Sequence, residues 1–99
     1  MFIAMNRFRI VLGREQEFEE IWKNRDTHLE NVSGFMNFNL VKGDKDDECT
    51  LYASHSTWES QDDFIAWTKS EAFKLAHKNA GQHKYIYIGH PVFEGFNVV

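Results

Sequence analysis

The sequence predicts an α+β fold in which helices cover one face of an antiparallel sheet. Three observations support this. Apolar residues alternate near both ends of the chain, apolar residues recur at helical spacing after Gly13, and a polar segment separates two strand-like runs in the middle. With 99 residues the chain can build one hydrophobic core, so we expect a single domain over residues 1–99.

The first third of the chain predicts a strand followed by a helix. Residues 2–11 are rich in Phe, Ile, Val and Met, and Gly13 closes this strand. From residue 14 to about residue 31 apolar side chains fall at helical spacing, and acidic residues cluster near the start, where they face the positive end of the helix dipole. The positions at this spacing are Phe18, Ile21, Trp22, Arg25 and Leu29. We therefore expect an amphipathic helix, ended by Ser33 and Gly34.

The middle of the chain predicts a hairpin. Residues 35–42 and 49–58 both read as strands, and the polar segment 43–48 (GDKDDE) lies between them as a turn.

Two short helices and a last strand complete the pattern. Ser60 followed by Asp63 resembles a capping box for a second helix, and Ser70 is placed to cap a further short helix. Pro91 introduces a final strand over 92–99. The resulting βαββαβ order is that of a ferredoxin-like fold, with helices on one face of the sheet.

The predicted strands are apolar on both faces. In the first strand Ala4 and Phe8 alternate with Ile3 and Met5, and the last strand shows the same two-sided pattern. Helices cover only one of these faces, so the other needs a cover. A second copy of the same sheet is the simplest one, and we expect a homodimer.

Composition argues against several classes of function. The net charge is −4 and no Lys/Arg cluster is visible, which disfavours nucleic-acid binding. We expect no secretion signal, no membrane segment and a cytoplasmic location. Cys49 is the one cysteine, so no intrachain disulfide is expected. The chain has no dinucleotide fingerprint and is too short for a flavin or nicotinamide domain, so we expect neither cofactor to be bound.

Asn6 is polar on an otherwise apolar strand face. A buried amide without a partner costs roughly 1–3 kcal/mol, so its side chain should bond to something. That partner could be a nearby backbone group or water at an edge. Alternatively, Asn6 is a donor aimed into a cavity between the sheet and the helices.

His77 and Trp67 each have a structural and a functional interpretation. A lone histidine on a helix is more often structural than a ligand, and a tryptophan on an amphipathic helix is usually core. A single neutral imidazole nevertheless suffices as the axial ligand of haem iron, whereas zinc needs three or four ligands. The remaining histidines form no metal-binding pattern. We place His28 on the helix surface and His83 and His90 at the mouth of a pocket, and leave the facing of His55 open.

A set of ordered motifs resembles a known superfamily. The motifs are N-R-F at 6–8, F-E-x-x-W at 18–22, G-F at 34–35, S-x-W at 56–58, F-x-x-W at 64–67 and S-x-A-F-x-x-A-H at 70–77. Together they resemble the antibiotic biosynthesis monooxygenase (ABM) superfamily, with closest likeness to its IsdG-type haem-degrading monooxygenases. The resemblance runs from residue 1 to about residue 79.

The resemblance implies a site and a chemistry. In that family Asn6, Trp67 and His77 would form the active site of a dimeric α+β barrel. Haem would lie between sheet and helices, with His77 on the iron, Asn6 donating a hydrogen bond on the distal side, and Trp67 pressing the porphyrin out of plane. Phe64 would help form the apolar wall. The protein would open the porphyrin ring with O₂ and electrons from an external donor, and release iron.

One segment departs from the family pattern. Residues 78–91 are shorter than the loop that helps to cover the haem in the best-known haem degraders. Lys78, His83 and Lys84 are candidate partners for the haem propionates.

Two other functions stay open on the sequence. One is a cofactor-independent oxygenase of a quinol or polyketide-like aromatic, which would use the same cavity without an iron ligand. The other is a non-catalytic dimeric ligand-binding domain.

Overall fold

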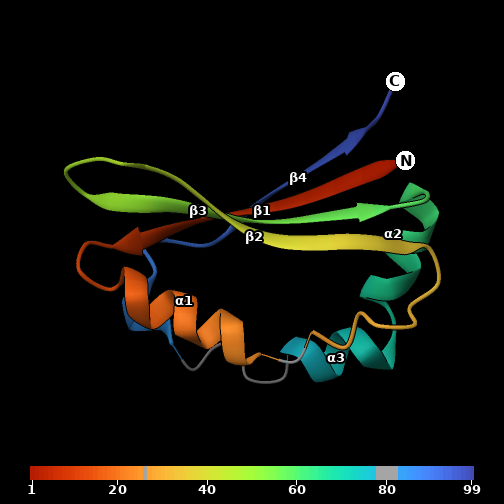
Figure 1. Cartoon of the computed structure of the whole chain (residues 1–99), viewed down its shortest axis with the longest axis horizontal. Helices are drawn as coiled ribbons and strands as arrows, with labels where there is room; N and C mark the ends of the chain where they lie inside the picture. The colour runs from red at the N-terminus through yellow and green to blue at the C-terminus, as the bar shows by residue number, and fades with distance from the viewer. Residues whose placement is uncertain (26, 78–82) are drawn as a thin grey trace.

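A computed structural model of the chain describes residues 1–25, 27–77 and 83–99. Within these ranges the elements follow the predicted order (Figure 1). They are β1 (Phe2–Val11), α1 (Glu15–Asn24), β2 (Phe35–Lys45), β3 (Cys49–Trp58), α2 (Gln61–Thr68), α3 (Glu71–His77), the 3₁₀ turn η1 (Lys84–Ile86) and β4 (Val92–Asn97).

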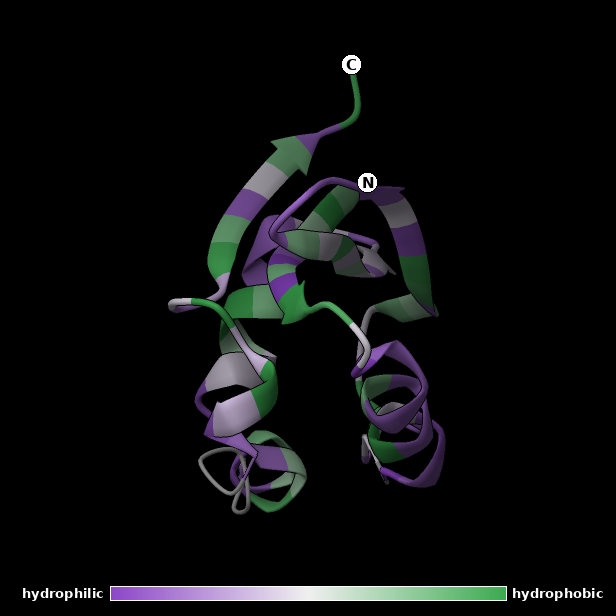
Figure 2. Cartoon of the chain, turned by 90° about the vertical axis from the view of Figure 1, so that its left-hand side faces the viewer, coloured by the Kyte–Doolittle hydropathy of each residue, from purple (hydrophilic) through white to green (hydrophobic). Residues whose placement is uncertain are grey.

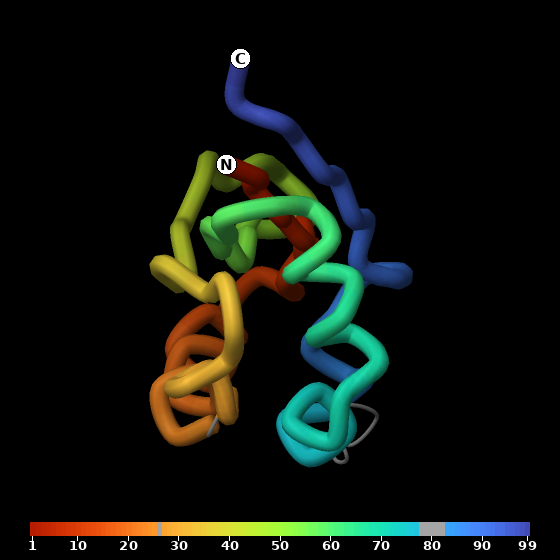
Figure 3. Tube along the Cα trace, turned by 90° about the vertical axis from the view of Figure 1, so that its right-hand side faces the viewer, coloured from red at the N-terminus to blue at the C-terminus, as the bar shows by residue number. Residues whose placement is uncertain are grey.

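The strands form one antiparallel sheet in the order β2-β3-β1-β4. Helices α1, α2 and α3 all lie on one face of this sheet (Figure 1). Seen along the sheet, α1 lies under one side, and α2 with α3 lies under the other (Figures 2 and 3). The predicted α+β, ferredoxin-like arrangement with helices on one face is confirmed.

The prediction of a helix from residue 14 to about residue 31 is wrong in its second half. Helix α1 ends at Asn24, and Arg25 is already extended, with φ −77° and ψ 132°. His28 and Asn31 adopt positive φ angles of 53° and 70°, which a right-handed helix does not allow, so His28 is not on a helix surface. Leu29 is buried from this irregular segment. Leu29 follows Arg25 by four residues, which is helical spacing, but its position is determined by packing against the core and not by a helix.

Two strand ends also differ from the prediction. Strand β2 continues through Gly43 and Asp44 to Lys45, with a register shift after Lys42, so the polar turn is shorter than residues 43–48. The Asp46 carboxylate accepts the backbone N–H groups of Glu48 and Cys49 at 2.7 and 2.8 Å and closes the turn. Strand β4 ends at Asn97, two residues before the predicted end.

The two predicted serine caps are present. The Ser60 hydroxyl oxygen accepts the backbone N–H of Asp63 at 3.2 Å at the start of α2. The Ser70 hydroxyl oxygen accepts the backbone N–H of Phe73 at 3.2 Å at the start of α3. Both caps satisfy backbone donors that have no partner inside the helix.

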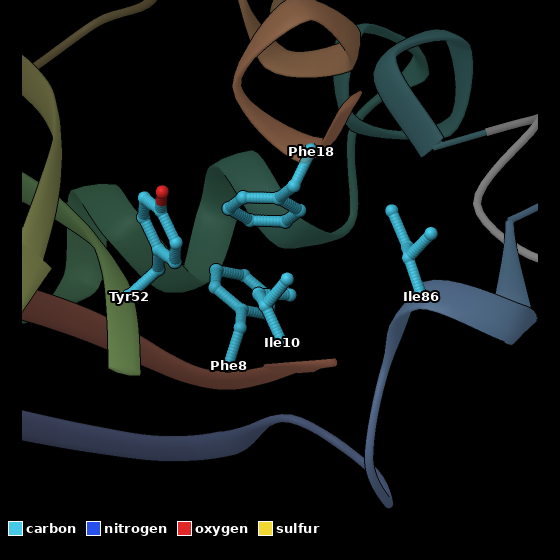
Figure 4. Packing of buried hydrophobic residues seen from close by; sticks show 5 residues of the cluster. All are labelled: Phe8, Ile10, Phe18, Tyr52 and Ile86. Atoms are coloured by element: carbon cyan, nitrogen blue, oxygen red, sulfur yellow. The ribbon is translucent and has the colours of Figure 1, made fainter. Parts of the chain in front are cut away.

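The buried side chains form two clusters on the helix side of the sheet. One cluster joins β1, β3, α1 and η1 through Phe8, Ile10, Phe18, Tyr52 and Ile86 (Figure 4). The other consists of Phe2, Ala4, Leu29 and Trp58. Trp22 packs against the first cluster, and Trp67 packs against the second. The two indole rings therefore mark the boundary between the clusters.

The acidic face of α1 is bonded to hydroxyl groups around it. The Thr50 hydroxyl donates to Glu15 at 2.9 Å, and the Tyr52 hydroxyl donates to Glu19. The Tyr85 hydroxyl donates to Glu17. These contacts hold the helix to β3 and to the η1 turn.

In the part of the chain that the structure describes, every helix is too short to cross a membrane.

Candidate functional site

A cavity opens between the sheet and the helices. It has two lobes of about 220 and 420 Å³, which share Asn6, Trp22, Arg25 and His77. The smaller lobe is also lined by Ala4, Met5, Thr27, Leu29, Phe38, Ser54, Ser56, Phe64, Trp67, Phe73, Ala76 and Phe93. The larger lobe is also lined by Phe8, Lys84, Tyr87, Gly89, His90 and Pro91. Together the lobes fall in the range of roughly 300–1,000 Å³ typical of small-molecule sites.

His77 is the last residue of α3 and lines both lobes. Its Nδ1 atom lies 2.9 Å from the backbone carbonyl oxygen of Phe73, one helical turn earlier. A carbonyl only accepts hydrogen bonds, so Nδ1 carries a hydrogen, and in the neutral ring Nε2 then has the lone pair. The ring also stacks on Phe73, with centroids 4.1 Å apart and planes 27° apart. This hydrogen bond and the stacking fix the ring so that Nε2 is the nitrogen available to a metal.

Asn6 extends from β1 on the helix-facing side of the sheet. Its neighbours in register are Ser54 on β3 and Phe93 on β4. The side chain is partly buried and lines both lobes, and it makes no hydrogen bond to the other described residues. Asn6 is therefore a polar side chain in the lining of the cavity.

Trp67 and Phe64 come from α2 and line the smaller lobe. Phe64 stacks on Phe93 with a centroid distance of 5.5 Å. Trp67 contacts Phe73 edge-on at 4.9 Å, and Phe73 in turn stacks on His77. The indole Nε1 atom of Trp67 is buried and has no hydrogen-bond partner among the described residues.

Arg25 is a cavity residue that the sequence analysis missed. Its guanidinium carbon lies 4.5 Å from the centroid of the Trp22 ring, and the side chain lines both lobes. We counted it among the positions of an apolar helical stripe. A permanent cation within such a stripe was the signal that could have marked it, because a charge on a core-facing position needs a partner.

The candidate propionate partners have different positions. Lys84 lines the larger lobe, as does His90, which we expected at the mouth of a pocket. His83 lines neither lobe, and its ring lies 6.3 Å from that of Tyr85. Lys78 falls outside the described residues.

Tyr87 adds a polar group to the larger lobe. Burial raises the pKa of this phenol above its ordinary value of 10.0, so it stays protonated at neutral pH and keeps a hydroxyl that can donate.

The geometry can be compared with known proteins. Residues 1–79 match the family model described as "Antibiotic biosynthesis monooxygenase". The chain belongs to this family. The match covers α1 and α2 and ends two residues beyond α3, so Asn6, Trp67 and His77 all lie inside it.

Curated relatives in this family are named haem oxygenases. The staphylobilin-producing haem oxygenase of Staphylococcus epidermidis is 32% identical over 82 residues, which is 83% of this chain and 78% of that protein. Its counterpart from Staphylococcus haemolyticus is 33% identical over 79 residues, covering 80% of this chain and 75% of that protein.

A solved structure in the family shows the same fold. It is the haem degrader MhuD of Mycobacterium tuberculosis with two haems bound in its active site. It aligns with a TM-score of 0.76 and 27% identity, covering 100% of this chain and 96% of that one.

Proposed function

We propose that this protein is a haem-degrading monooxygenase that binds haem in the cavity between the sheet and the helices. The observation that carries the proposal is the state of His77. Its Nδ1–H is committed to Phe73, its Nε2 has no hydrogen-bond partner among the described residues, and the side chain lines the cavity that Asn6 also lines. The likeness to proteins named haem oxygenases and to the haem degrader MhuD supports the choice of substrate.

The residues of the cavity fit a haem. The porphyrin supplies four nitrogen ligands, so one histidine completes the protein's share of the coordination. Phe64, Trp67 and Phe73 give an apolar wall suited to a flat ring. Arg25 and Lys84 are cations at the larger lobe, where they can pair with carboxylates.

Each residue then has a role on the bound substrate. Haem supplies both the iron that activates O₂ and the ring that is oxidised, with electrons from an external donor. His77 would hold the iron. Asn6 would donate a hydrogen bond from β1, and Trp67 with Phe64 would pack against the porphyrin. Ring opening would release the iron.

We further propose that two copies pair through the sheet face that carries no helix. Val92 and Phe96 on β4 and Val41 on β2 are exposed at 58%, 44% and 41%. Figure 2 shows the apolar bands along β4. All three positions are in register with residues of that face, Arg7, Ile3 and Ala53. Apolar side chains on an uncovered sheet face favour a sheet-to-sheet partner. A cytoplasmic location stays a prediction of the sequence.

A haem titration tests the proposal. Wild-type protein, His77→Ala and the matched control His83→Ala are titrated with ferric haem and then given ascorbate under air. We expect saturable binding and decay of the Soret band in wild type and in His83→Ala, because His83 lies outside both lobes. His77→Ala should lose the spectrum of the histidine-bound iron and the decay.

Two results would overturn the proposal. Wild-type protein that fails to bind haem saturably, or a His77→Ala variant with the wild-type spectrum and decay, would remove His77 from the chemistry. Consumption of O₂ with an added quinol or polyketide-like aromatic would then identify a cofactor-independent oxygenase in the same cavity. No turnover of either substrate would leave a ligand-binding domain.

A further inference from the structure

Ser54 lies directly opposite Asn6 across β1 and β3. The two residues are register partners in the antiparallel pair, so their side chains leave the same face of the sheet, with Cβ atoms roughly 4.5–5.5 Å apart. Both line the smaller lobe of the cavity. Ser54 is only 9% exposed, although it is polar.

The Ser54 hydroxyl has no protein partner in the described part of the chain, and neither does the Asn6 amide. Neither group is among the fully buried unpartnered atoms of the described residues, so both reach the cavity, where their hydrogen bonds can be satisfied by water or by a ligand.

Ser56 provides the contrast within the same strand. It lies two residues further along, on the same face, and is buried to 8% exposure. Its hydroxyl donates to the carbonyl oxygen of Ala4 at 3.4 Å and accepts the indole N–H of Trp58 at 2.9 Å. A hydroxyl has one hydrogen, so Ser56 has none left for a ligand, whereas Ser54 has.

We propose that Ser54 is the second hydrogen-bond donor of this site. With Asn6 it forms a two-donor seat on the sheet side of the cavity for a small acceptor. Given the proposed function, on which this inference rests, that acceptor would be a small ligand of the haem iron. It would receive one hydrogen bond from Asn6 and a second from Ser54.

Fluoride is a suitable probe because it binds ferric haem iron and can only accept hydrogen bonds. Haem-loaded wild type, Asn6→Ala, Ser54→Ala, Ser54→Thr and Ser56→Ala are titrated with fluoride and followed by absorbance. One neutral hydrogen bond corresponds to roughly a three- to tenfold change in affinity. We expect Asn6→Ala and Ser54→Ala each to weaken fluoride binding by about that factor. Ser54→Thr, which keeps the hydroxyl, should stay within about twofold of wild type.

The Ser56→Ala control removes a hydroxyl whose hydrogen is already used inside the protein, so it shows whether the loss of any serine hydroxyl from this strand affects fluoride binding. It should leave fluoride affinity unchanged and lower the thermal stability of the protein, because it removes the acceptor of the Trp58 indole. Ser54→Ala removes an unpaired hydroxyl, so its apo form should unfold at or above the wild-type temperature.

The results separate this inference from the function beneath it. If wild type binds no haem, the proposed function fails and this role of Ser54 fails with it. If wild type and Ser54→Ala bind haem equally well and also bind fluoride equally well, the function stands and the role of Ser54 is overturned. Equal weakening by Ser54→Ala and Ser56→Ala would likewise overturn it, because the effect would then come from the strand and not from a free donor.

Discussion

The Nδ1 atom of His77 and the carbonyl oxygen of Phe73 lie 2.9 Å apart, within one turn of α3. The same two residues also stack ring on ring at 4.1 Å. The helix backbone thus sets the tautomer of His77, and the Phe73 side chain sets the orientation of its ring.

Removing the Phe73 ring should loosen His77 without touching its hydrogen bond. We expect Phe73→Ala to weaken haem binding by about tenfold or more, as losses in the support of a metal ligand commonly do. Leu75→Ala on the same helix, at an exposed position, is the matched control and should bind haem like wild type. Equal affinities for wild type and Phe73→Ala would show that the backbone alone orients the ring.

Trp67 and Trp58 allow a paired comparison of buried indoles. Trp58 donates its N–H to Ser56 at 2.9 Å, whereas the N–H of Trp67 is buried without a partner among the described residues. We expect Trp58→Phe to lower the free energy of unfolding by about 1–3 kcal/mol, and Trp67→Phe to lower it by less than about 1 kcal/mol. Urea denaturation of the apo proteins measures both.

The same pair should separate stability from activity. Trp67→Phe is expected to slow haem degradation, because a smaller ring presses less on the porphyrin. Trp58→Phe should degrade haem at the wild-type rate below its unfolding temperature. The opposite order of the two rates would contradict the role proposed for Trp67.

Arg25 should contribute to haem affinity through its charge. We expect Arg25→Gln to weaken haem binding about five- to tenfold and to reduce the dependence of binding on salt. Arg14→Gln is the control, because Arg14 lies over the Tyr85 ring at 5.2 Å and outside the cavity. An unchanged salt dependence in Arg25→Gln would exclude a contact with the propionates.

Glu15 should make stability depend on pH. Its own backbone N–H, the Thr50 hydroxyl and the Gly13 N–H hold the pKa of this carboxyl below its ordinary value of 4.5. A depressed folded-state pKa stabilises the protein above 4.5, and that contribution is lost as the pH falls through the lower folded value. We expect Glu15→Gln to unfold at lower urea than wild type at pH 7, and the two midpoints to converge in acid. Glu20→Gln keeps the contact between Glu15 and Thr50, so its urea midpoint should change with pH as that of wild type does.

The uncovered sheet face predicts the effect of a charge placed on it. Phe96→Glu should convert a homodimer to a monomer, because each copy would then bury an unpaired carboxylate in the apolar interface. Sedimentation measures the change, and Leu75→Glu, on a helix away from this face, should stay dimeric. Wild-type protein that sediments as a monomer at micromolar concentration would refute the pairing.

The strands and caps were predictable because their signals are local. Alternation placed Asn6 on the helix-facing side of β1, and the serine spacing placed the starts of α2 and α3. The end of α1 was not predictable, because Leu29 keeps helical spacing while the chain before it is already extended. That geometry depends on packing against Trp58 and Phe2, which are distant in the sequence.

The site was predictable only in the part that the family motifs carry. The structural interpretation carried more weight for each of Asn6, Trp67 and His77 taken alone, and their joint spacing in the family motifs changed the balance. Ser54 had no such signal. Its role follows only from the structure. The strand register places Ser54 opposite Asn6, and Ser56 donates its hydroxyl hydrogen to Ala4.

The acid–hydroxyl bonds of α1 are unevenly distributed along the helix. Glu15, Glu17 and Glu19 secure its first half, whereas Trp22 and Arg25 follow at the end that lines the cavity. Ring contacts hold the second half instead, because Trp22 packs against Phe8, Phe18 and Phe38. A ligand that displaces the Trp22 ring would therefore leave the bonds to Thr50, Tyr52 and Tyr85 in place.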